Sequence, residues 1–269
     1  MSDEFKPLAI IGTGTFAEII LKRILGNGFL QPHDIIATTR RPERADYLRK
    51  GYGINVELDN LHAAARSRTM MLCVKPQDIN VVSESLKTFD PVDRVLISVV
   101  AGVSLKKLES LFRSKVTFRA NPNPQIELGC GYTAIAAQPD TGERTKKWVE
   151  GLFSCLGETT FLNESALDIV SVLSGITHVL YFFDCLIDAG IYLGLPKETT
   201  EKIAYQSIMG AMQLWNRQKE PPSEMIRKAT TPGGLSVEKI LIFEQRGVKA
   251  AIIEAMRAAR EKAASFNIE

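Results

Sequence analysis

The stretch Leu8–Ala17, LAIIGTGTFA, decides the fold, because it joins a short apolar run to a glycine turn of the form GxGxxA. Leu8–Ile11 has the length of a buried strand, and the apolar residues after the turn recur at helical spacing. In such a unit the first glycine allows a tight turn, and the second leaves room for a pyrophosphate at the helix N-terminus. The stretch predicts a dinucleotide site, with a plain glycine turn as the alternative. The predicted cofactor residues are Gly12, Thr13, Gly14, Thr15 and Phe16.

Outward from this unit, apolar runs alternate with helix-like segments up to residue 162. Further strands are predicted at residues 34–38, 69–74, 94–100, 116–119 and 159–162, and helices at 42–50, 77–86, 104–112 and 140–156. Strands that alternate with helices indicate βαβ units. The predicted fold class is therefore α/β, with an N-terminal Rossmann-type parallel sheet.

The chain changes character after residue 162, because no further strand is predicted there. Helices are predicted at residues 165–195, with an interruption at Ser174–Gly175, at 197–217 and at 248–266. We therefore expect two domains, a dinucleotide-binding α/β domain at residues 1–162 and an all-α domain at residues 163–269.

The composition is that of a soluble globular protein. Of the 269 residues, 45% are hydrophobic and 24% are charged, and 33 Lys and Arg against 31 Asp and Glu leave a formal charge of +2. This near balance creates no field that attracts polyanions, so neither nucleic acid nor a membrane is expected as a partner. The N-terminal residues lack the pattern of a signal peptide, and we expect a cytoplasmic protein.

The most apolar window, residues 179–195, carries two aspartates near its middle. Because a charged side chain costs about 3 kcal/mol at the centre of a bilayer, we interpret this window as a buried helix of a soluble protein. No metal site is expected, because the four cysteines form no CxxC pair and His33, His62 and His178 share no ligand spacing.

The second predicted strand ends in Thr38–Arg41, TTRR. An NAD site typically has an acidic residue here that accepts from the ribose 2′-hydroxyl, whereas hydroxyls and guanidinium groups suit a 2′-phosphate. Thr39, Arg40 and Arg41 therefore predict a preference for NADPH over NADH, with a solvated basic loop as the alternative. Lys75, at the end of the strand predicted at 69–74, either holds a phosphate or carboxylate or caps the sheet edge.

The chain resembles the Δ1-pyrroline-5-carboxylate reductase family, which reduces a cyclic imine to proline with NAD(P)H, nearly from end to end. The most specific segment is TTPGG at Thr230–Gly234, since the family has a Ser/Thr-Pro-Gly-Gly loop before its final helices. The other matching segments are GTGTFAE, TTRR, VKP at 74–76, SVVAGVSL at 98–105, PN at 122–123, SG at 174–175, GLP at 194–196, GV at 247–248 and IEA at 253–255.

The resemblance implies a Rossmann half followed by an all-helical dimerisation half. Two subunits would interlock through the helical halves as a homodimer or larger homo-oligomer, and both chains would contribute to each active site. The TTPGG loop would receive the substrate carboxylate through backbone N–H groups, with the hydroxyl of Ser236 beside the imine nitrogen. The further residues implied are Asn60, Val74, Lys75, Pro76, Ala101 and Gly102 for the cofactor, and Asn123, Ser174, Gly233, Gly234 and Leu235 for the substrate.

The segment Ser174–Val179, SGITHV, departs from the family's Ser-Gly-Ser-Gly-Pro-Ala, because larger side chains and an imidazole replace small residues. The family's Met-Pro-Asn-Thr-Pro appears as NPNPQ at 121–125, without its threonine. These departures concern the substrate more than the cofactor. His178 is either a helix histidine satisfied by a neighbour or a group that supplies a proton or binds the carboxylate.

We therefore expect NADPH-dependent reduction of a small cyclic imine by direct hydride transfer without a metal, with pyrroline-5-carboxylate as the first candidate and proline as its product. Ser236 and His178 are the candidate catalytic residues. Two alternatives remain open. The first is a reductase of a different small imine or carbonyl compound, and the second is a non-catalytic NADP(H)-binding sensor on the same fold.

Overall fold

The computed structural model describes residues 3–91 and 94–264. These residues form two compact units, one of residues 3–174 with 260–264 and the other of residues 175–259. The domain boundary expected between residues 162 and 163 stays a prediction. The predicted helix at 248–266 is observed as α12 (Val248–Ala264), and its last two residues lie outside the described part of the chain.

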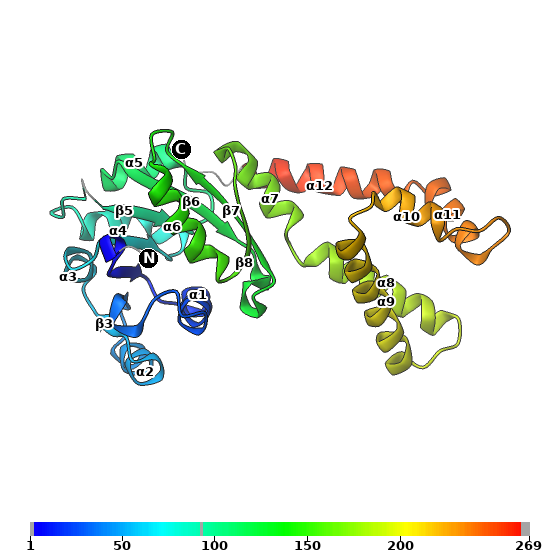
Figure 1. Cartoon of the computed structure of the whole chain (residues 1–269), viewed down its shortest axis with the longest axis horizontal. Helices are drawn as coiled ribbons and strands as arrows, with labels where there is room; N and C mark the ends of the chain where they lie inside the picture. Colours follow the sequence, from blue (N-terminus) through cyan, green and yellow to red (C-terminus); the bar gives the residue numbers. More distant parts are fainter. Residues whose placement is uncertain (1–2, 92–93, 265–269) are drawn as a thin grey trace. The chain divides into compact units, whose positions relative to one another are not determined.

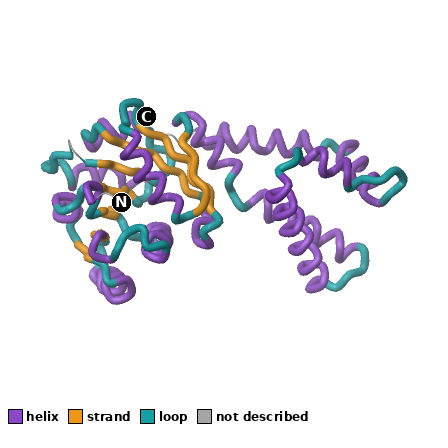
Figure 2. The backbone as a smooth tube through the Cα atoms, in the orientation of Figure 1, coloured by secondary structure: helices purple, strands orange, loops and turns teal. Residues whose placement is uncertain are grey.

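The first unit contains an eight-stranded sheet in the order β3-β2-β1-β4-β5-β6-β7-β8 (Figures 1 and 2). Neighbouring strands are parallel except β6 and β7, which are antiparallel. The predicted α/β fold class is confirmed, with a sheet that is parallel in the main. The strands are β1 (Leu8–Ile11), β2 (Ile35–Thr38), β3 (Asn55–Glu57), β4 (Thr69–Leu72), β5 (Val95–Ser98), β6 (Val116–Pro122), β7 (Gly131–Ala137) and β8 (Gly157–Phe161).

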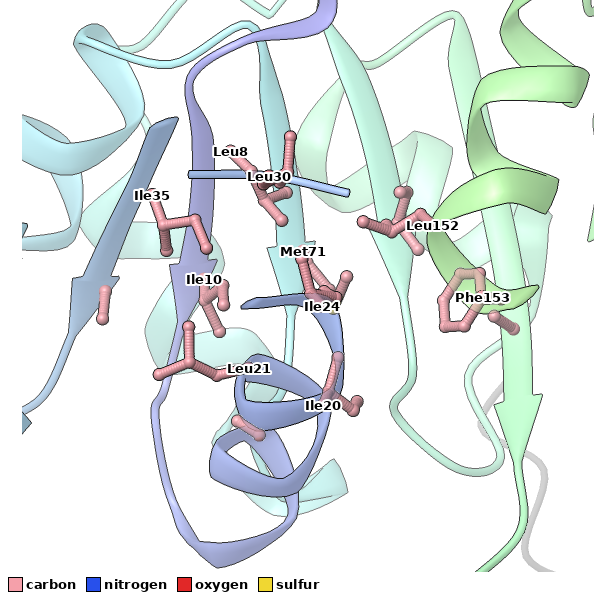
Figure 3. Close-up of a cluster of buried hydrophobic side chains, with 14 of the residues drawn as sticks. Leu8, Ile10, Ile20, Leu21, Ile24, Leu30, Ile35, Met71, Leu152 and Phe153 are labelled. Carbon is pink, nitrogen blue, oxygen red and sulfur yellow. The ribbon is translucent and has the colours of Figure 1, made fainter. Parts of the chain in front are cut away.

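Successive side chains of a strand point to opposite faces of the sheet. The apolar strands therefore have buried side chains on both faces, and helices cover both. In β1, Leu8 and Ile10 pack with α1 (Thr15–Gly26), α2 and α6, whereas Ala9 and Ile11 pack with α3, α4 and α5. Figure 3 shows the first cluster, in which side chains of β1, α1 and α6 meet. The remaining helices of this unit are α2 (Pro42–Tyr52), α3 (Asn60–Ala65), α4 (Ile79–Ser85), α5 (Leu105–Phe112), α6 (Glu143–Ser154) and α7 (Leu167–Leu173).

The second unit consists of helices. In addition to most of α12 it holds α8 (Thr177–Tyr192), α9 (Lys197–Gln218), α10 (Pro222–Lys228) and α11 (Leu235–Gln245). The helices α8 and α9 pack side by side (Figure 1). Their approach is close at Gly190, where a Cβ atom would lie 2.3 Å from Cγ2 of the buried Thr200.

Few side chains of the second unit are buried within a single chain. Tyr181 is 74% exposed and Tyr192 is 90% exposed. The interpretation of residues 179–195 as a buried helix is therefore wrong for one chain, because the described residues of that chain leave most of these side chains exposed. By length and composition alone, Glu164–Tyr192 would be long and apolar enough to cross a membrane. One such stretch is weak evidence for a membrane span.

Candidate active site

The glycine turn after β1 requires a glycine at its first position. Gly12 has φ +87°, a conformation that L-residues with side chains rarely adopt. A Cβ atom on Gly12 would lie 2.4 Å from Cγ1 of Val74. The predicted residues Gly12 and Val74 are thus packed against each other where β1 and β4 end.

The second glycine of the turn borders open space. Gly14 is the N-cap of α1, and a Cβ atom there would have nothing within 4 Å. Within the described part of the chain no side chain caps this helix, so the N–H groups of its first turn are free to receive a ligand. Uncapped N–H groups at a helix N-terminus suit a phosphate, and the space a Cβ would fill lets one approach. The residues present therefore fit a dinucleotide pyrophosphate.

A chain of hydrogen bonds connects this turn to the neighbouring loops. The N–H of Gly12 donates to Oγ1 of Thr38 at 3.0 Å, and that hydroxyl donates to Oδ1 of Asn60 at 2.8 Å. Nδ2 of Asn60 in turn donates to Oγ of Ser85 at 3.2 Å. The predicted cofactor residue Asn60 therefore links β2 to α4 beneath the turn.

The basic loop after β2 is open to solvent. The side chain of Arg40 is 88% exposed, and Nη2 lies 4.0 Å from a carboxylate oxygen of Asp78. Arg41 is exposed, and its N–H donates to Oγ1 of Thr39 at 3.4 Å. Both guanidinium groups can therefore turn toward an anion at this loop.

The remaining predicted cofactor residues follow β4 and β5. Lys75 is exposed and immediately precedes the short helix η3 (Pro76–Asp78). Ala101 is exposed, and Gly102 has φ +72°. Because β1 to β5 are parallel, the segments after these strands share one edge of the sheet. The fold thus places every predicted cofactor residue at that edge.

The TTPGG loop leads into α11. Gly233 has φ +71°, and Gly234 is the N-cap of α11 without a side-chain cap. A Cβ atom on Gly234 would lie 2.5 Å from Oγ1 of Thr231. Ser236 stands in the first turn and is half-buried, whereas Leu235 is 86% exposed. The N–H of Gly234 donates to the carbonyl oxygen of Thr231 at 2.9 Å, so the donors next to the Ser236 hydroxyl are the N–H groups of the first turn of α11.

Asn123 and Ser174, two predicted substrate residues, are brought together in the first unit. Nδ2 of Asn123 donates to the carbonyl oxygen of Ser174 at 3.1 Å, and Nε2 of Gln125 donates to the same oxygen at 3.3 Å. Oδ1 of Asn123 accepts from the N–H of Tyr132 at 3.0 Å. The oxygen and the nitrogen of the Asn123 side-chain amide are thus both hydrogen-bonded to backbone groups of the protein, at the end of α7.

His178 is the second residue of α8 and is half-buried. Among the described residues, no hydrogen bond joins His178 to Ser236, which lies in the same unit. The described residues also contain no group of three His, Cys, Asp or Glu side chains placed to hold a metal ion.

The sequence pattern missed a cluster of polar side chains beside the glycine turn. Glu18 in α1 is 8% exposed and binds the guanidinium of Arg44 in α2. A signal was present, because Glu18 stands next to Ala17 on the face of the helix that also carries buried Leu21. A carboxylate at a core position of an amphipathic helix indicates a buried partner.

Comparison with known proteins places the chain in a family. Pyrroline-5-carboxylate reductase dimerisation is the family that matches residues 164–266, and NADP oxidoreductase, coenzyme F420-dependent, is the family that matches residues 7–102. The pyrroline-5-carboxylate reductase of Synechocystis sp. is 36% identical over 259 residues, which are 94% of this chain and 95% of that protein.

Two solved structures are similar over their whole length. A pyrroline-5-carboxylate reductase from Coxiella burnetii has a TM-score of 0.90 and 25% identity, and the match covers 98% of this chain and 100% of that one. A pyrroline carboxylate reductase from Plasmodium falciparum with NADP bound has a TM-score of 0.84 and 22% identity, covering 98% and 99%. Since the identity to the Synechocystis enzyme exceeds 30% over nearly all of both chains, this chain belongs to the pyrroline-5-carboxylate reductase family.

Proposed function

We propose that this protein reduces the C=N bond of pyrroline-5-carboxylate and forms proline, with NADPH as the cofactor, as a step of proline biosynthesis. The observation that carries the proposal is the glycine turn, in which Gly12 packs on Val74 and Gly14 leaves the N-terminus of α1 open. It occurs in a chain 36% identical to a pyrroline-5-carboxylate reductase over nearly its full length. When bound, NADPH supplies a hydride to the imine carbon, and the imine nitrogen takes up a proton.

The cofactor-binding residues act in three groups. Gly12, Thr13, Gly14, Thr15 and Phe16 receive the pyrophosphate, and Thr39, Arg40 and Arg41 receive the 2′-phosphate. Asn60, Val74, Lys75, Pro76, Ala101 and Gly102 border the remaining cofactor along the carboxyl edge of the sheet. The support for this assignment is that all of these residues follow β1 to β5 at one edge.

The substrate residues lie in both units. The N–H groups of Gly233 and Leu235 bind the substrate carboxylate, because a helix N-terminus favours an anion. Gly234 shapes the loop that presents them, since its own N–H donates to the carbonyl oxygen of Thr231 at 2.9 Å. The hydroxyl of Ser236 donates to the imine nitrogen, and His178 supplies the proton or orients the carboxylate. Asn123 acts through Ser174, whose carbonyl oxygen it holds.

Two copies of the chain form a homodimer through the helical domain, at residues 163–269, while residues 1–162 bind NADPH. The support is the match of residues 164–266 to a dimerisation domain, together with the exposed apolar side chains of α8 to α12. We place the enzyme in the cytoplasm, with no nucleic-acid or membrane partner.

The proposal is tested with the purified full-length protein by following NADPH absorbance against pyrroline-5-carboxylate and its six-membered and sulfur-containing analogues. Oxidation with pyrroline-5-carboxylate as the preferred substrate supports the proposal. Preference for an analogue would identify a reductase of another imine, for which the larger side chains of Ser174–Val179 are the motivating observation. Tight NADPH binding without oxidation by any imine would identify a non-catalytic binding protein.

A further inference from the structure

A half-buried arginine, Arg44, contacts the glycine turn from the side of α2. Nε of Arg44 donates to the carbonyl oxygen of Thr13 at 3.3 Å, and Nη2 of the same guanidinium donates to Glu18. The Arg44 side chain is 18% exposed and that of Glu18 is 10% exposed. One guanidinium therefore joins the turn after β1, the first helix and the second helix.

Further donors hold the carboxylate of Glu18 in place. Tyr47 and Tyr52 both donate their hydroxyls to Oε1 of Glu18, the first of them at 3.0 Å, and Nζ of Lys22 lies 3.5 Å from the same oxygen. Burial by itself would raise the pKa of Glu18, but hydrogen bonds from Tyr52, Arg44 and Tyr47 outweigh it and lower the pKa to about 2. Glu18 is therefore an anion at neutral pH and keeps Arg44 in one position.

The position of the Thr13 carbonyl matters for the cofactor, because the peptide group that follows Thr13 is planar. Its oxygen is held by Arg44, and its other end, the N–H of Gly14, donates to the carbonyl oxygen of Gly12 at 2.9 Å. With both ends held, this peptide plane has a single orientation. Gly14 is the N-cap of α1, so the plane sets the direction in which the free N–H groups of the first turn point.

We infer that Arg44, oriented by Glu18, is a positioning residue for the pyrophosphate of the dinucleotide cofactor. The inference rests on the proposed function in that NADPH is taken as the cofactor. Arg44 acts through the Thr13–Gly14 peptide and not by contact with the reacting atoms. Its role differs from that of Arg40, because the pyrophosphate is common to NADPH and NADH whereas the 2′-phosphate is not.

The experiment measures the binding of NADPH and of NADH separately, by fluorescence titration of the full-length protein in the absence of any imine. For Arg44→Gln we expect the dissociation constants of both nucleotides to rise about 10-fold, which corresponds to one lost charge-assisted hydrogen bond, with their ratio unchanged. Arg49→Gln is the matched control, because Arg49 lies in the same helix and bonds to Asp46 and to the carbonyl oxygen of Val56 at 2.6 Å without reaching the turn. Its dissociation constants should stay within about twofold of the wild type.

Glu18→Gln provides a second route to the same answer if Arg44→Gln folds poorly. It keeps the shape of the side chain and removes the charge that orients Arg44, so both dissociation constants should rise again. The double variant should bind each nucleotide with a dissociation constant no higher than that of the single variant that binds less tightly, because the two residues act as one unit. Thermal melting of every variant separates lost stability from lost affinity.

Unchanged affinity in Arg44→Gln and Glu18→Gln, with both variants folded, would overturn the inference. Loss for NADPH alone would also overturn it, since Arg44 would then be a ligand of the 2′-phosphate. An equal loss in Arg49→Gln would make the effect a general property of α2 and would overturn it as well. Failure of the wild-type protein to bind either nucleotide would refute the proposed function, which is a distinct result.

Discussion

Gly12 and Gly14 stand two positions apart in one turn and are glycine for different physical reasons. At Gly12 the backbone has φ +87° and the space for a side chain is already filled by Val74. At Gly14 the backbone is extended, with φ −81°, and the space for a side chain is open. The fold requires the first glycine, and we propose that the cofactor requires the second.

Replacing each glycine by alanine should therefore separate stability from binding. Gly12→Ala should lower the free energy of unfolding by about 2–4 kcal/mol, from backbone strain and overpacking together. Gly14→Ala should change it by no more than about 1 kcal/mol and still weaken NADPH roughly 10-fold or more. Chemical denaturation and NADPH titration of both variants check this. Equal destabilisation by the two changes would contradict it.

Arg40 is expected to determine which nicotinamide cofactor is preferred. Because its side chain is 88% exposed and lies 4.0 Å from Asp78, it has little structural work to do. Arg40→Ala should therefore weaken NADPH by roughly 1–3 kcal/mol and leave NADH unchanged. Steady-state KM values for the two cofactors provide the measurement, and an equal rise in both would contradict the assignment.

Glu18 should make the stability of the folded protein depend on pH in the acid range. Its pKa is about 2 in the folded protein against an ordinary value of 4.5, so it stabilises the fold above pH 4.5 and loses that contribution as the pH falls toward 2. Glu18→Gln has no charge to lose. The difference in Tm between wild type and Glu18→Gln should therefore be largest at neutral pH and shrink from pH 4.5 downward. A difference that stays constant to pH 3 would contradict the shifted pKa.

At the scale of elements, the start of α11 combines two features that suit an imino acid. The helix begins at Gly234 without a side-chain cap, and Ser236 stands in its first turn. A carboxylate and the neighbouring nitrogen could thus be received by one turn of helix, through backbone N–H groups and one hydroxyl. The start of α11 as a whole therefore supports the proposed substrate more strongly than any single residue does.

Ser236→Ala should lower kcat on the order of 10–100-fold, the effect of one lost hydrogen bond, without changing the dissociation constant of NADPH. Ser236→Thr should retain most of the activity, since it keeps the hydroxyl and adds only a methyl group. Steady-state kinetics of the two variants make the comparison. Equal loss in both would indicate a packing role for Ser236 and not a donor role.

The elements that the sequence pattern predicted are those with a continuous apolar run or a clear helical period. Leu8–Ile11 and Val95–Ser98 are buried on both faces and are apolar almost throughout, so they were recognisable. The three residues of β3 are too short to show a period, and β7, GYTAIAA, is rich in small residues. Its antiparallel pairing to β6 depends on contacts far apart in the sequence, which local pattern does not contain.

The candidate site divides in the same way. The glycine turn and the TTRR loop are contiguous motifs, so each could be found by spacing and chemistry alone. The partnership of Glu18 with Arg44 could not, because 26 positions separate the two residues and only the tertiary fold brings them together. Its single local sign was a carboxylate among buried residues of α1.

At the scale of the whole molecule, the two units differ in how completely one chain satisfies them. The sheet has large buried clusters on both faces, whereas α11 and its neighbours leave residues such as Leu241, Ile242 and Phe243 between 42% and 53% exposed. Apolar patches of this kind mark association surfaces. A second copy of the chain is the partner that the family assignment supports.

Phe243→Asp should therefore weaken the homodimer. An unpaired carboxylate in an apolar interface should raise the dissociation constant on the order of 100-fold or more. Leu58→Asp is the matched control, because Leu58 is 53% exposed on the sheet unit and its replacement should leave association unchanged. Sedimentation velocity over a range of protein concentrations measures both. A Phe243→Asp protein that stays dimeric at all concentrations would contradict the placement of the interface.

The hydrogen bonds that run from Gly12 through Thr38 to Asn60 have a practical consequence for redesign. They connect the glycine turn to the end of β2 and the start of α3 without using the side chains of Arg40 or Arg41. To change the cofactor preference of the enzyme to NADH, these two arginines can therefore be exchanged for acidic residues while the hydrogen bonds from Gly12 to Asn60 are kept. Thr38, one position before the loop, is the residue that such a library should never vary.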